Sequence, residues 1–599
     1  MAHLLGAEAL HLEFPTRIVF DSVSLGVDDG DRIGIVGRNG DGKSSLLGML
    51  AGRLSPDSGR VTVRGGVRIG VLDQGDTLAD DDTVGHAVVG DAAEHEWAGD
   101  PRARDVIAGL IGDLDWEATL ATLSGGQRRR VALARLLAGD WDVLALDEPT
   151  NHLDVEAIAW LAEHLKRRWS AGTGGLLVVT HDRWFLDEVC TTTWEVHDRI
   201  VEPFEGGYAA YILQRVERDR QAAAIEARRQ NLARKELAWL RRGAPARTSK
   251  PKFRIEAANT LIADVPEIRD GVSLRSLAVS RLGKDVVDLL DASVVYGDRE
   301  VLHQVEWRIA PGERTGILGV NGAGKSTLLG MIAGTVEPSA GRVKRGKTVR
   351  VATLTQRMDE LEEHLEDPVR VVISRLNTSY TIGSGSKAQE LTPGQLLERM
   401  GFASAQLSTP VKDLSGGQRR RLQLLLILLD QPNVLILDEP TNDLDTDMLA
   451  AIEDLLDSWA GTLIVVSHDR YFIERVTDQQ YAILDSRLRH LPGGVDEYLR
   501  LRQDQRRRAA ERPATSAPAS AAQTPGLSGA ELRAAQKEVA AIERRLAKLA
   551  EQIDARRTAL ADHDQSDYVG LGDKMAAIRE LEQETEELEE RWLDLSERI

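Results

Sequence analysis

Two glycine-rich segments carry the residue types that wrap around phosphate groups. They read Gly37-Arg38-Asn39-Gly40-Asp41-Gly42-Lys43-Ser44-Ser45 and Gly319-Val320-Asn321-Gly322-Ala323-Gly324-Lys325-Ser326-Thr327. Glycines let the backbone approach phosphates with its amides pointing inward, and the N-terminus of a following helix adds a favourable dipole. We expect Lys43 and Lys325 to reach the β- and γ-phosphates of a nucleotide, and the hydroxyls of Ser44 and Ser326 to bind Mg²⁺.

Two Asp-Glu pairs follow short apolar runs further along the chain. Asp147 and Glu148 follow residues 143–146, and Asp438 and Glu439 follow residues 434–437. Buried parallel strands have this apolar character. The first carboxylate of each pair is suited to hold Mg²⁺, and the second to polarise an attacking water as a general base. Taken alone, such a pair is more typical of a solvated loop, but its position after a phosphate loop favours the catalytic interpretation.

A third pair of motifs combines serine, glycines and glutamine before a helical pattern. These are Ser124-Gly125-Gly126-Gln127 and Ser415-Gly416-Gly417-Gln418. Ser124 could act only as a helix N-cap. The glycines, however, would expose amides to a γ-phosphate where the helix dipole is positive. His181 and His468 follow, each within His-Asp-Arg.

All four pairs of motifs recur in the same order, so the chain contains a duplicated domain of enzyme size. Apolar residues 32–36 precede the first phosphate loop and predict a buried strand, and residues 46–50 predict the start of a helix. We therefore expect an α/β fold in each half.

Different sequence separates and follows the two halves. Residues 211–242 have helical spacing without proline, and Gly243-Ala244-Pro245-Ala246 interrupts them. Residues 510–529 are rich in Ala, Pro and Ser and predict a flexible tether, and apolar residues at steps of three and four beyond it predict an antiparallel coiled-coil hairpin. The predicted boundaries are 1–207 and 285–502 for the repeated domains, 208–284 for the linker, 503–529 for the tether and 530–599 for the hairpin.

Composition limits the classes of function. The chain has 599 residues, is 42% hydrophobic and has a net charge of −20, so any nucleic-acid partner must meet a local basic patch. The single cysteine, Cys190, cannot form an intrachain disulfide, which fits a reduced, cytoplasmic compartment. We expect no secretory signal and no membrane span.

The order of these motifs resembles the ABC ATPase superfamily, over nearly all of residues 1–210 and 285–500. The resemblance implies two ATP molecules between head-to-tail cassettes, with Lys43 and Glu148 opposite residues 415–418 and Lys325 and Glu439 opposite residues 124–127. It implies that Asp154 and Asp445 face across the cassette pair, that His181 and His468 contact the γ-phosphate, and that Gln74 and Gln356 sense Mg²⁺ and the attacking water. Phe14 and Tyr296 match the aromatic that stacks on adenine, and each precedes its phosphate loop by the same 23 residues. A core aromatic is the alternative for Phe14.

Both halves retain a full set of motifs, with Asp41 and Ser45 as mild departures from the superfamily pattern. Asp41 could weaken ATP binding if its carboxylate points into the loop.

Soluble twin cassettes in one chain resemble the ABC-F family. Twin-cassette DNA-repair ATPases carry long coiled-coil or zinc insertions, which this sequence lacks. Residues 237–247 look particularly like the Uup branch, to which a C-terminal hairpin also belongs.

The linker is basic within an acidic protein. Its basic residues are Arg228, Arg229, Arg234, Lys235, Arg241, Arg242, Arg247, Lys250, Lys252 and Arg254. A solvated helix face is one interpretation. The other is contact with RNA phosphates by Arg241, Arg242, Arg247, Lys250 and Lys252, because the ABC-F resemblance implies a linker that reaches tRNA sites on the ribosome. The hairpin is basic on its first helix and acidic on its second.

Three functions follow from this reading. The leading hypothesis is a ribosome-associated ATPase that binds in its ATP-closed state, is released by hydrolysis, and regulates translation, rescues stalled ribosomes or protects against antibiotics. The second is a Uup-like ATPase acting on branched or replicating DNA. The third, the energy subunit of an exporter, leaves the basic linker without a purpose. The cassettes pair within one chain, so no obligate oligomer is expected.

Overall fold

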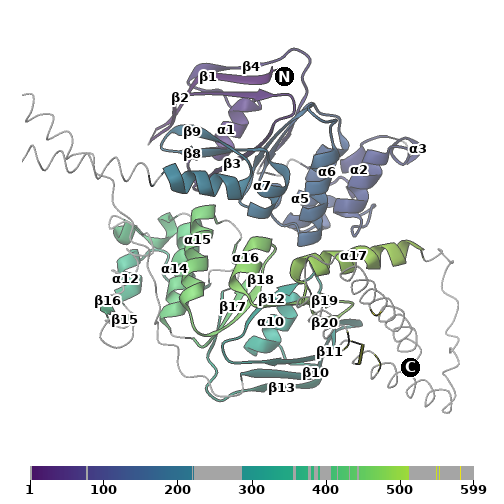
Figure 1. Cartoon of the computed structure of the whole chain (residues 1–599), viewed down its shortest axis with the longest axis vertical. Coiled ribbons are helices and arrows are strands. Elements are labelled where there is room, and N and C mark those ends of the chain that lie inside the picture. The colour runs from purple at the N-terminus through teal and green to yellow at the C-terminus, as the bar shows by residue number, and fades with distance from the viewer. Residues whose placement is uncertain are drawn as a thin grey trace, which may run out of the picture. The chain divides into compact units, whose positions relative to one another are not determined.

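The computed structural model describes most of both repeated domains. The described residues are 3–15, 17–73, 75, 78–92, 94–218, 220, 286–354, 359–374, 380–382, 389–391, 402, 406–414, 416–430, 432–441 and 444–511, with single positions at 545, 548, 549, 552 and 581. The chain divides into two compact units, residues 1–509 and 510–599. Both cassettes belong to the first unit (Figure 1).

Cassette 1 is built on two sheets. An antiparallel sheet has the order β2-β1-β4, formed by β1 (His3–Phe14), β2 (Arg17–Asp28) and β4 (Ser58–Val63). The larger sheet has the order β5-β6-β7-β3-β8-β9. Its strands are β3 (Arg32–Gly37), β5 (Ile69–Leu72), β6 (Val143–Asp147), β7 (Gly175–Val179), β8 (Thr192–His197) and β9 (Ile200–Glu205). All of its pairs are parallel except β8 with β9.

Cassette 2 repeats this arrangement. Its small sheet has the order β11-β10-β13, formed by β10 (Val287–Tyr296), β11 (Arg299–Ile309) and β13 (Ala340–Arg345). Its large sheet has the order β14-β17-β18-β12-β19-β20. The strands are β12 (Arg314–Leu318), β14 (Val351–Leu354), β17 (Val434–Asp438), β18 (Thr462–Val466), β19 (Gln479–Leu484) and β20 (Arg487–His490). An additional hairpin joins β15 (Tyr380–Ile382) and β16 (Gln389–Leu391).

Helices follow the strands in corresponding order in the two cassettes. The matching pairs are α1 (Lys43–Leu50) with α10 (Lys325–Ala333), α5 (Gly125–Ala138) with α14 (Gly416–Leu429), α6 (Val155–Arg167) with α15 (Thr446–Ser458), and α7 (Arg183–Val189) with α16 (Arg470–Val476). Shorter elements are α2 (Val84–Val89), α3 (Glu94–Trp97), α4 (Pro101–Val106), a π-helix (Ile107–Ile111), α11 (Asp359–Glu362), α12 (Val369–Ser374), and 3₁₀ turns at Leu120–Thr122, Gln406–Ser408 and Val411–Asp413.

The central strands are buried because helices and a second sheet cover their faces. All five residues of β6, β7 and β18 are buried, and for β6 the apolar run of residues 143–146 predicted this. One core of cassette 1 lies between the two sheets and α1, and another lies under α5 and α6. The carboxyl ends of the parallel strands are therefore held rigidly, and the loops that follow them carry the candidate site residues.

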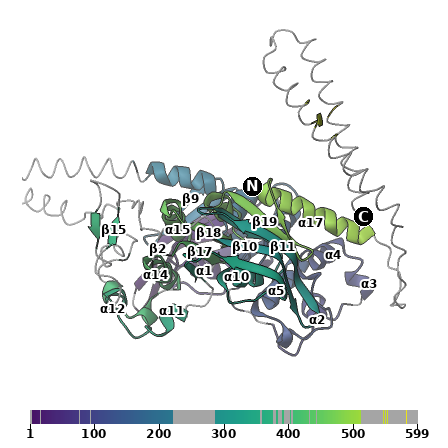
Figure 2. The same ribbon diagram turned by 90° about the horizontal axis from the view of Figure 1, so that it is seen from below.

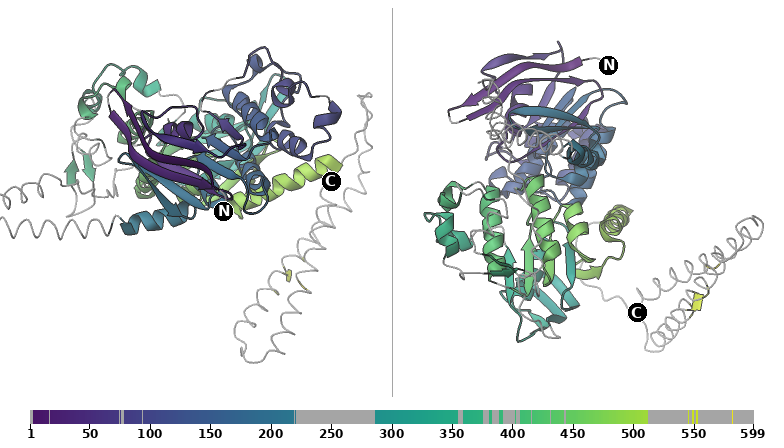
Figure 3. Two further views of the ribbon diagram at one scale, coloured as in Figure 1. Left: turned by 90° about the horizontal axis from the view of Figure 1, so that it is seen from above. Right: turned by 60° about the vertical axis from the view of Figure 1, so that its left-hand side comes forward.

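The cassettes contact each other through α7, α15 and α16, which lie between the two sheet systems in Figure 1. The right-hand view of Figure 3 shows the two cassettes one above the other. Arg183 Nη2 lies 2.5 Å from Glu453 Oε1 and 3.4 Å from Asp469 Oδ2, and all three side chains are buried. Tyr471 donates a hydrogen bond of 3.0 Å to Asp187. The duplicated halves thus form a pair within one chain.

Each cassette ends in a helix, which we call its exit helix. Residues 208–218 are helical and begin the predicted linker, and α17 (Gly494–Glu511) follows cassette 2 (Figure 2). The predicted tether begins at residue 503, whereas α17 continues to Glu511. The reason is local: Arg506, Arg507 and Arg508 extend a helical pattern, and the first proline comes only at Pro513.

The structure describes few residues of the other predicted segments. The remainder of the linker, the Ala/Pro/Ser stretch and nearly all of the predicted hairpin lie outside the described residues. Among the described residues, no helix combines the length and apolar character that crossing a membrane requires.

Candidate active sites

The phosphate loops have the backbone conformation that only glycine adopts easily. Gly42 and Gly324 are the N-caps of α1 and α10, with φ of 105° and 103°. A Cβ on Gly42 would lie 2.4 Å from the side chain of Val19, and one on Gly324 would lie 2.7 Å from Val301. Both loops therefore keep an open concave backbone at a helix N-terminus, which is the form that binds phosphate oxygens.

The lysine of each loop turns back over it. Lys43 Nζ donates to Gly37 O at 2.9 Å, and Lys325 Nζ donates to Gly319 O at 2.7 Å. Burial lowers the pKa of both lysines, against the opposing influence of nearby carboxylates, Glu148 and Glu439 first among them. Each ammonium group thus lies between its phosphate loop and the catalytic carboxylate predicted from the sequence.

Glu148 and Glu439 occupy a strained backbone position directly after β6 and β17. Both have φ of 48°, a left-handed conformation that non-glycine residues rarely adopt. Hydrogen bonds fix this turn, since the amide of Glu148 donates to Val179 O at 2.8 Å and that of Glu439 donates to Val466 O at 2.9 Å. Strand ends in both cassettes therefore hold the predicted general bases in one defined place.

Each predicted histidine lies beside its glutamate. His181 Nε2 is 3.3 Å from Glu148 Oε1, and His468 Nε2 is 3.3 Å from Glu439 Oε1. The same nitrogens lie 3.2 Å from Asn39 Oδ1 and 3.3 Å from Asn321 Oδ1, in the phosphate loops. The structure thus brings loop, glutamate and histidine together in both cassettes.

Both imidazoles are neutral in this environment. Burial and the nearby Lys43 lower the pKa of His181 to about 3, and burial with Lys325 lowers the pKa of His468 well below its usual value. Nε2 of His181 faces acceptor oxygens and can carry the proton. Nε2 of His468, by contrast, faces Asn321 Oδ1 at 3.3 Å and the donor Lys325 Nζ at 3.4 Å. The contact of both histidines with a γ-phosphate oxygen stays a prediction.

In each cassette, the serine after the phosphate-loop lysine lies beside the aspartate of the Asp-Glu pair, so that both offer oxygen ligands to one ion. Ser44 bonds the carboxylate of Asp147, and Ser326 Oγ lies 3.5 Å from Asp438 Oδ2. Burial raises the pKa of both aspartates, and the buried Asp147 Oδ1 accepts no hydrogen bond within the described part of the chain. A hydroxyl and a carboxylate beside a phosphate loop are ligands that Mg²⁺ prefers, so these residues fit the ion. The predicted Gln74 and Gln356 lie outside the described residues.

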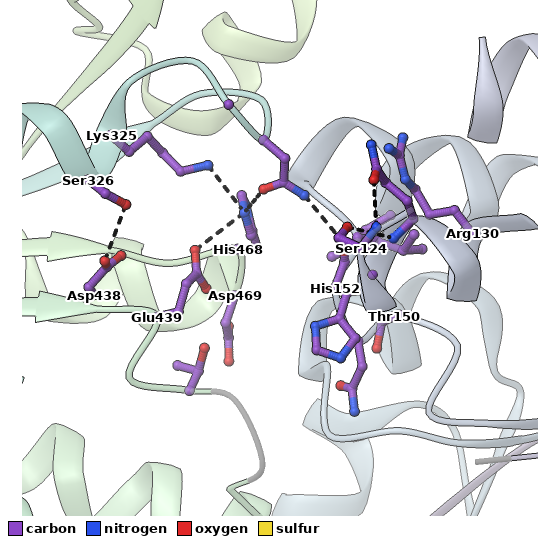
Figure 4. A pocket seen from close by; sticks show the side chains of 18 of the residues that line it. Ser124, Arg130, Thr150, His152, Lys325, Ser326, Asp438, Glu439, His468 and Asp469 are labelled. Carbon is purple, nitrogen blue, oxygen red and sulfur yellow. Dashed lines mark hydrogen bonds and ion pairs between the residues drawn. The ribbon is translucent and has the colours of Figure 1, made fainter. Parts of the chain in front are cut away.

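Residues of both cassettes line one cavity of about 760 Å³. Cassette 2 contributes its phosphate loop, Asp438, Glu439 and His468, and cassette 1 contributes Ser124, Gly126 and Gln127 from the opposite side (Figure 4). Ser124 forms a capping box with Gln127 at the start of α5, so its N-cap role and its place in the cavity coexist. We call this cavity site 2, and the corresponding place at the phosphate loop of cassette 1 site 1.

At site 1 the contacts across the cassettes run through the segment before α15. The amide of Asn39 donates to Asp445 Oδ2 at 3.1 Å, and Arg38 Nε lies 3.1 Å from Asp447 Oδ2. At site 2 the side-chain amide of Asn321 donates to His152 O at 3.4 Å. Each phosphate loop therefore faces the segment that contains Asp154 or Asp445 of the other cassette. Ser415 lies outside the described residues, and Gly416, Gly417 and Gln418 begin α14.

The two aromatics predicted to stack on adenine are exposed. Phe14 ends β1 and is 41% exposed, and Tyr296 ends β10 and is 53% exposed. Tyr296 lines site 2. Phe14 is therefore not a core aromatic, and both rings present a face that a purine can cover.

Sequence reasoning missed two pairs of arginines at these sites. Arg17 and Arg299 follow the aromatics by three residues and donate to the carbonyls of Gly40 and Gly322. Arg129 and Arg420, inside the repeated Gln-Arg-Arg-Arg, donate to the carbonyls of Asp147 and Glu439. These arginines recur at corresponding positions of the two repeated domains, and this recurrence could have identified them from the sequence. Asp41, noted as a departure from the superfamily, is half-buried, and burial raises the pKa of its carboxyl group.

Comparisons with known proteins agree with this geometry. The ABC transporter family matches residues 20–151 and 302–442, and the family described as ABC transporter C-terminal domain matches residues 532–597. The uncharacterized ABC transporter ATP-binding protein YfmR of Bacillus subtilis (strain 168) is 34% identical, over 99% of this chain and 98% of that protein. The energy-dependent translational throttle protein EttA of Escherichia coli (strain K12) is 34% identical, over 77% of this chain and 88% of that protein. The chain belongs to the ABC-F family of tandem ATP-binding-cassette proteins.

Solved structures of lower similarity show the same fold. RNase-L Inhibitor aligns with a TM-score of 0.56 and 22% identity, over 82% of this chain and 93% of that one. The archaeal ribosome recycling factor aABCE1, solved with a ribosomal stalk protein, aligns with a TM-score of 0.54 and 20% identity, over 82% of this chain and 92% of that one. The ABC transporter family match and the relation to EttA, and not these structures, show that this ABC-F protein binds ATP in its cassettes and is an ATP hydrolase. The assignment of Phe14, the signature residues and the Mg²⁺ ligands to individual ATP contacts stays a prediction.

Proposed function

We propose that this ABC-F protein acts on the ribosome, binding there with ATP between its cassettes and leaving after hydrolysis. The relation to the translational throttle EttA is the observation that carries the proposal, because it covers 77% of this chain and 88% of that protein. The predicted basic residues Arg241, Arg242, Arg247, Lys250 and Lys252 lie in the segment between the cassettes, outside the described residues. In this proposal they contact RNA phosphates.

The geometry of the two sites supports an ATP-driven cycle. Each phosphate loop is completed by residues of the other cassette, so bound ATP favours the paired state. Glu148 and Glu439 then accept a proton from the attacking water, while Lys43, Lys325 and the neutral histidines stabilise charge on the γ-phosphate. Mg²⁺ held by Ser44 and Asp147, or by Ser326 and Asp438, would neutralise phosphate charge. Hydrolysis removes the group that joins the halves.

Cosedimentation with ribosomes tests the proposal. The variant Glu148→Gln/Glu439→Gln keeps the residues that bind ATP and lacks the general bases, so it should pellet with ribosomes in the presence of ATP and not in its absence. Charge reversal of Arg241, Arg242 and Arg247 to Glu in this background should abolish pelleting, and the pelleting should weaken with salt.

A matched control separates local contact from net charge. Arg60, Arg167 and Arg308 lie on the cassettes with side chains 69%, 76% and 72% exposed, and their reversal to Glu changes the net charge equally. This control should still pellet. An equal loss of pelleting in both triple variants would show that the net charge of the protein, and not a contact made by the linker, causes the binding. Absence of ATP-dependent pelleting under every condition would contradict the ribosome proposal and favour branched DNA as the target, which the same variants then test.

A further inference from the structure

Both exit helices contact the opposite cassette at the same place. Residues 208–218 carry Tyr211 and Arg215, and α17 carries Tyr498 and Arg502 at corresponding positions. Arg215 binds Asp447 with both terminal nitrogens, at 2.7 and 3.2 Å. Arg502 Nε lies 2.5 Å from Glu156 Oε1. The acidic partner is in each case the second residue after the aspartate that caps α15 or α6.

These acidic residues stand directly beside the segments that complete the ATP sites. Asp445 is the N-cap of α15 and accepts the amide of Asn39 in the phosphate loop of cassette 1. Asp154 is the N-cap of α6, and the neighbouring His152 accepts from Asn321 in the phosphate loop of cassette 2. A displacement of either helix N-terminus therefore moves one phosphate-loop contact, at site 1 or at site 2.

The contacts are partly buried and reinforced. Glu156 is buried and also receives the hydroxyl of Tyr498 at 2.8 Å, and Arg506 lies 2.8 Å from its second oxygen. Asp447 additionally binds Arg38, which belongs to the phosphate loop of cassette 1 itself. Bidentate arginine contacts fix orientation as well as distance. The arrangement at site 1 thus links exit helix, opposite helix N-terminus and phosphate loop in one chain of hydrogen bonds.

We propose that Arg215 and Arg502 are positioning residues for ATP hydrolysis, each acting on a different site through the opposite cassette. Arg215, at the entrance to the linker, sets the position of Asp445 and so controls site 1, where Glu148 is the base. Arg502, at the entrance to the C-terminal segment, sets the position of residues 152–154 and so controls site 2, where Glu439 is the base. The inference rests on ATP hydrolysis alone and does not require the ribosome contact proposed above.

Site-resolved trapping tests this assignment in the full-length chain. A photoreactive ATP analogue is hydrolysed in the presence of vanadate, the trapped nucleotide is crosslinked, and labelled peptides are assigned to cassette 1 or cassette 2. Arg502→Gln should lower the label on cassette 2 by about tenfold and leave cassette 1 nearly unchanged, and Arg215→Gln should do the reverse. Steady-state kinetics should show the loss in kcat more than in KM.

Further variants distinguish positioning from general structure. Arg502→Lys, which keeps one charged donor, should recover part of the cassette 2 label, and Glu156→Gln/Arg502→Gln should lose no more than the stronger single variant. Arg64→Gln, which removes a contact of 3.3 Å to Asp29 within cassette 1, serves as control and should leave both labels unchanged. Equal loss on both cassettes for Arg215→Gln or Arg502→Gln, or no loss on either, would overturn the proposal.

Discussion

The catalytic glutamate of cassette 2 is held in an environment that disfavours its charge. Glu439 is buried, and neither of its carboxylate oxygens accepts a hydrogen bond within the described part of the chain. Burial raises its pKa to about 8, with Lys325 opposing the shift. Such an environment destabilises the carboxylate and favours the protonated form at neutral pH, which makes the carboxylate a stronger base at a cost in stability.

Glu439→Gln should therefore stabilise the protein in a pH-dependent way. The folded-state pKa lies above that of the unfolded chain, so the contribution of Glu439 to stability is fully present below the unfolded value and is lost as the pH rises toward about 8. The neutral amide removes this loss. The melting temperature of the variant should exceed that of the wild type by a few degrees near about pH 8, and the difference should shrink toward about pH 5.

Thermal unfolding across this pH range measures the effect. The control is Glu8→Gln, whose side chain is 61% exposed. A constant difference between Glu439→Gln and wild type at every pH would show that the carboxyl group is not the cause.

The exposed aromatic of site 2 gives a second prediction at this scale. Tyr296→Ala removes the ring that a purine would cover, which is worth about 1–3 kcal/mol. We expect ATP affinity at site 2 to fall by roughly 5- to 150-fold. Tyr296→Phe keeps the ring and should bind like wild type in a nucleotide-binding titration. Equal affinities for all three proteins would exclude stacking on this residue.

At the scale of elements, a buried ionic cluster joins α7 to α15 and α16. Arg183 lies between Glu453 and Asp469, and charges from all three meet where the cassettes touch. Removing the cation from such a cluster leaves carboxylates without compensation, which costs about 3–5 kcal/mol. The cluster therefore makes the contact between cassettes sensitive to a single side chain.

Arg183→Ala should weaken the pairing of the cassettes and lower ATP turnover. Because the excess negative charge causes the loss, a second change, Glu453→Gln, should recover part of it. Hydrogen exchange of α7 and α16 in the presence of ATP reports the pairing directly. Failure of the second change to recover any protection would assign the loss to packing instead.

The elements themselves were predictable, and the contacts between halves were not. The phosphate loop, the Asp-Glu strand end and the histidine each combine a local residue pattern with a local backbone requirement. Their positions after β3, at the end of β6 and between β7 and α7 therefore follow from short stretches of sequence. Arg215 and Asp447 are 232 residues apart, and their contact depends on how one cassette is set against the other. No local sequence pattern encodes the placement of one cassette against the other. The only sequence sign of these contacts that we identify is the Tyr-x-x-x-Arg that recurs after each cassette.

At the scale of the whole molecule, the two halves that complete each site belong to one chain. Contacts such as Asn39 with Asp445 and the lining of site 2 by both cassettes are intramolecular. Closure on ATP is then a first-order event that does not need a second copy.

Specific ATPase activity should accordingly be independent of protein concentration. We expect the rate per molecule to stay constant over about a hundredfold dilution, since joined modules keep their effective concentration. Sedimentation velocity under the same conditions should show a single monomeric species with and without ATP. Activity that falls on dilution would indicate pairing between chains.

The exit-helix contacts also bear on how the duplicated gene has changed since its duplication. Arg215 and Arg502 are the same residue type, but their partners, Asp447 and Glu156, differ by one methylene, and the buried Glu195 that Tyr211 binds has Ala482 at the corresponding strand position. The two halves are therefore not interchangeable at these contacts, although their ATP motifs match. Gene conversion that copied one half over the other would preserve every ATP motif and still mismatch these partners. A chain built from two copies of one half would therefore keep both sets of ATP motifs but lose the matched partners of its exit helices.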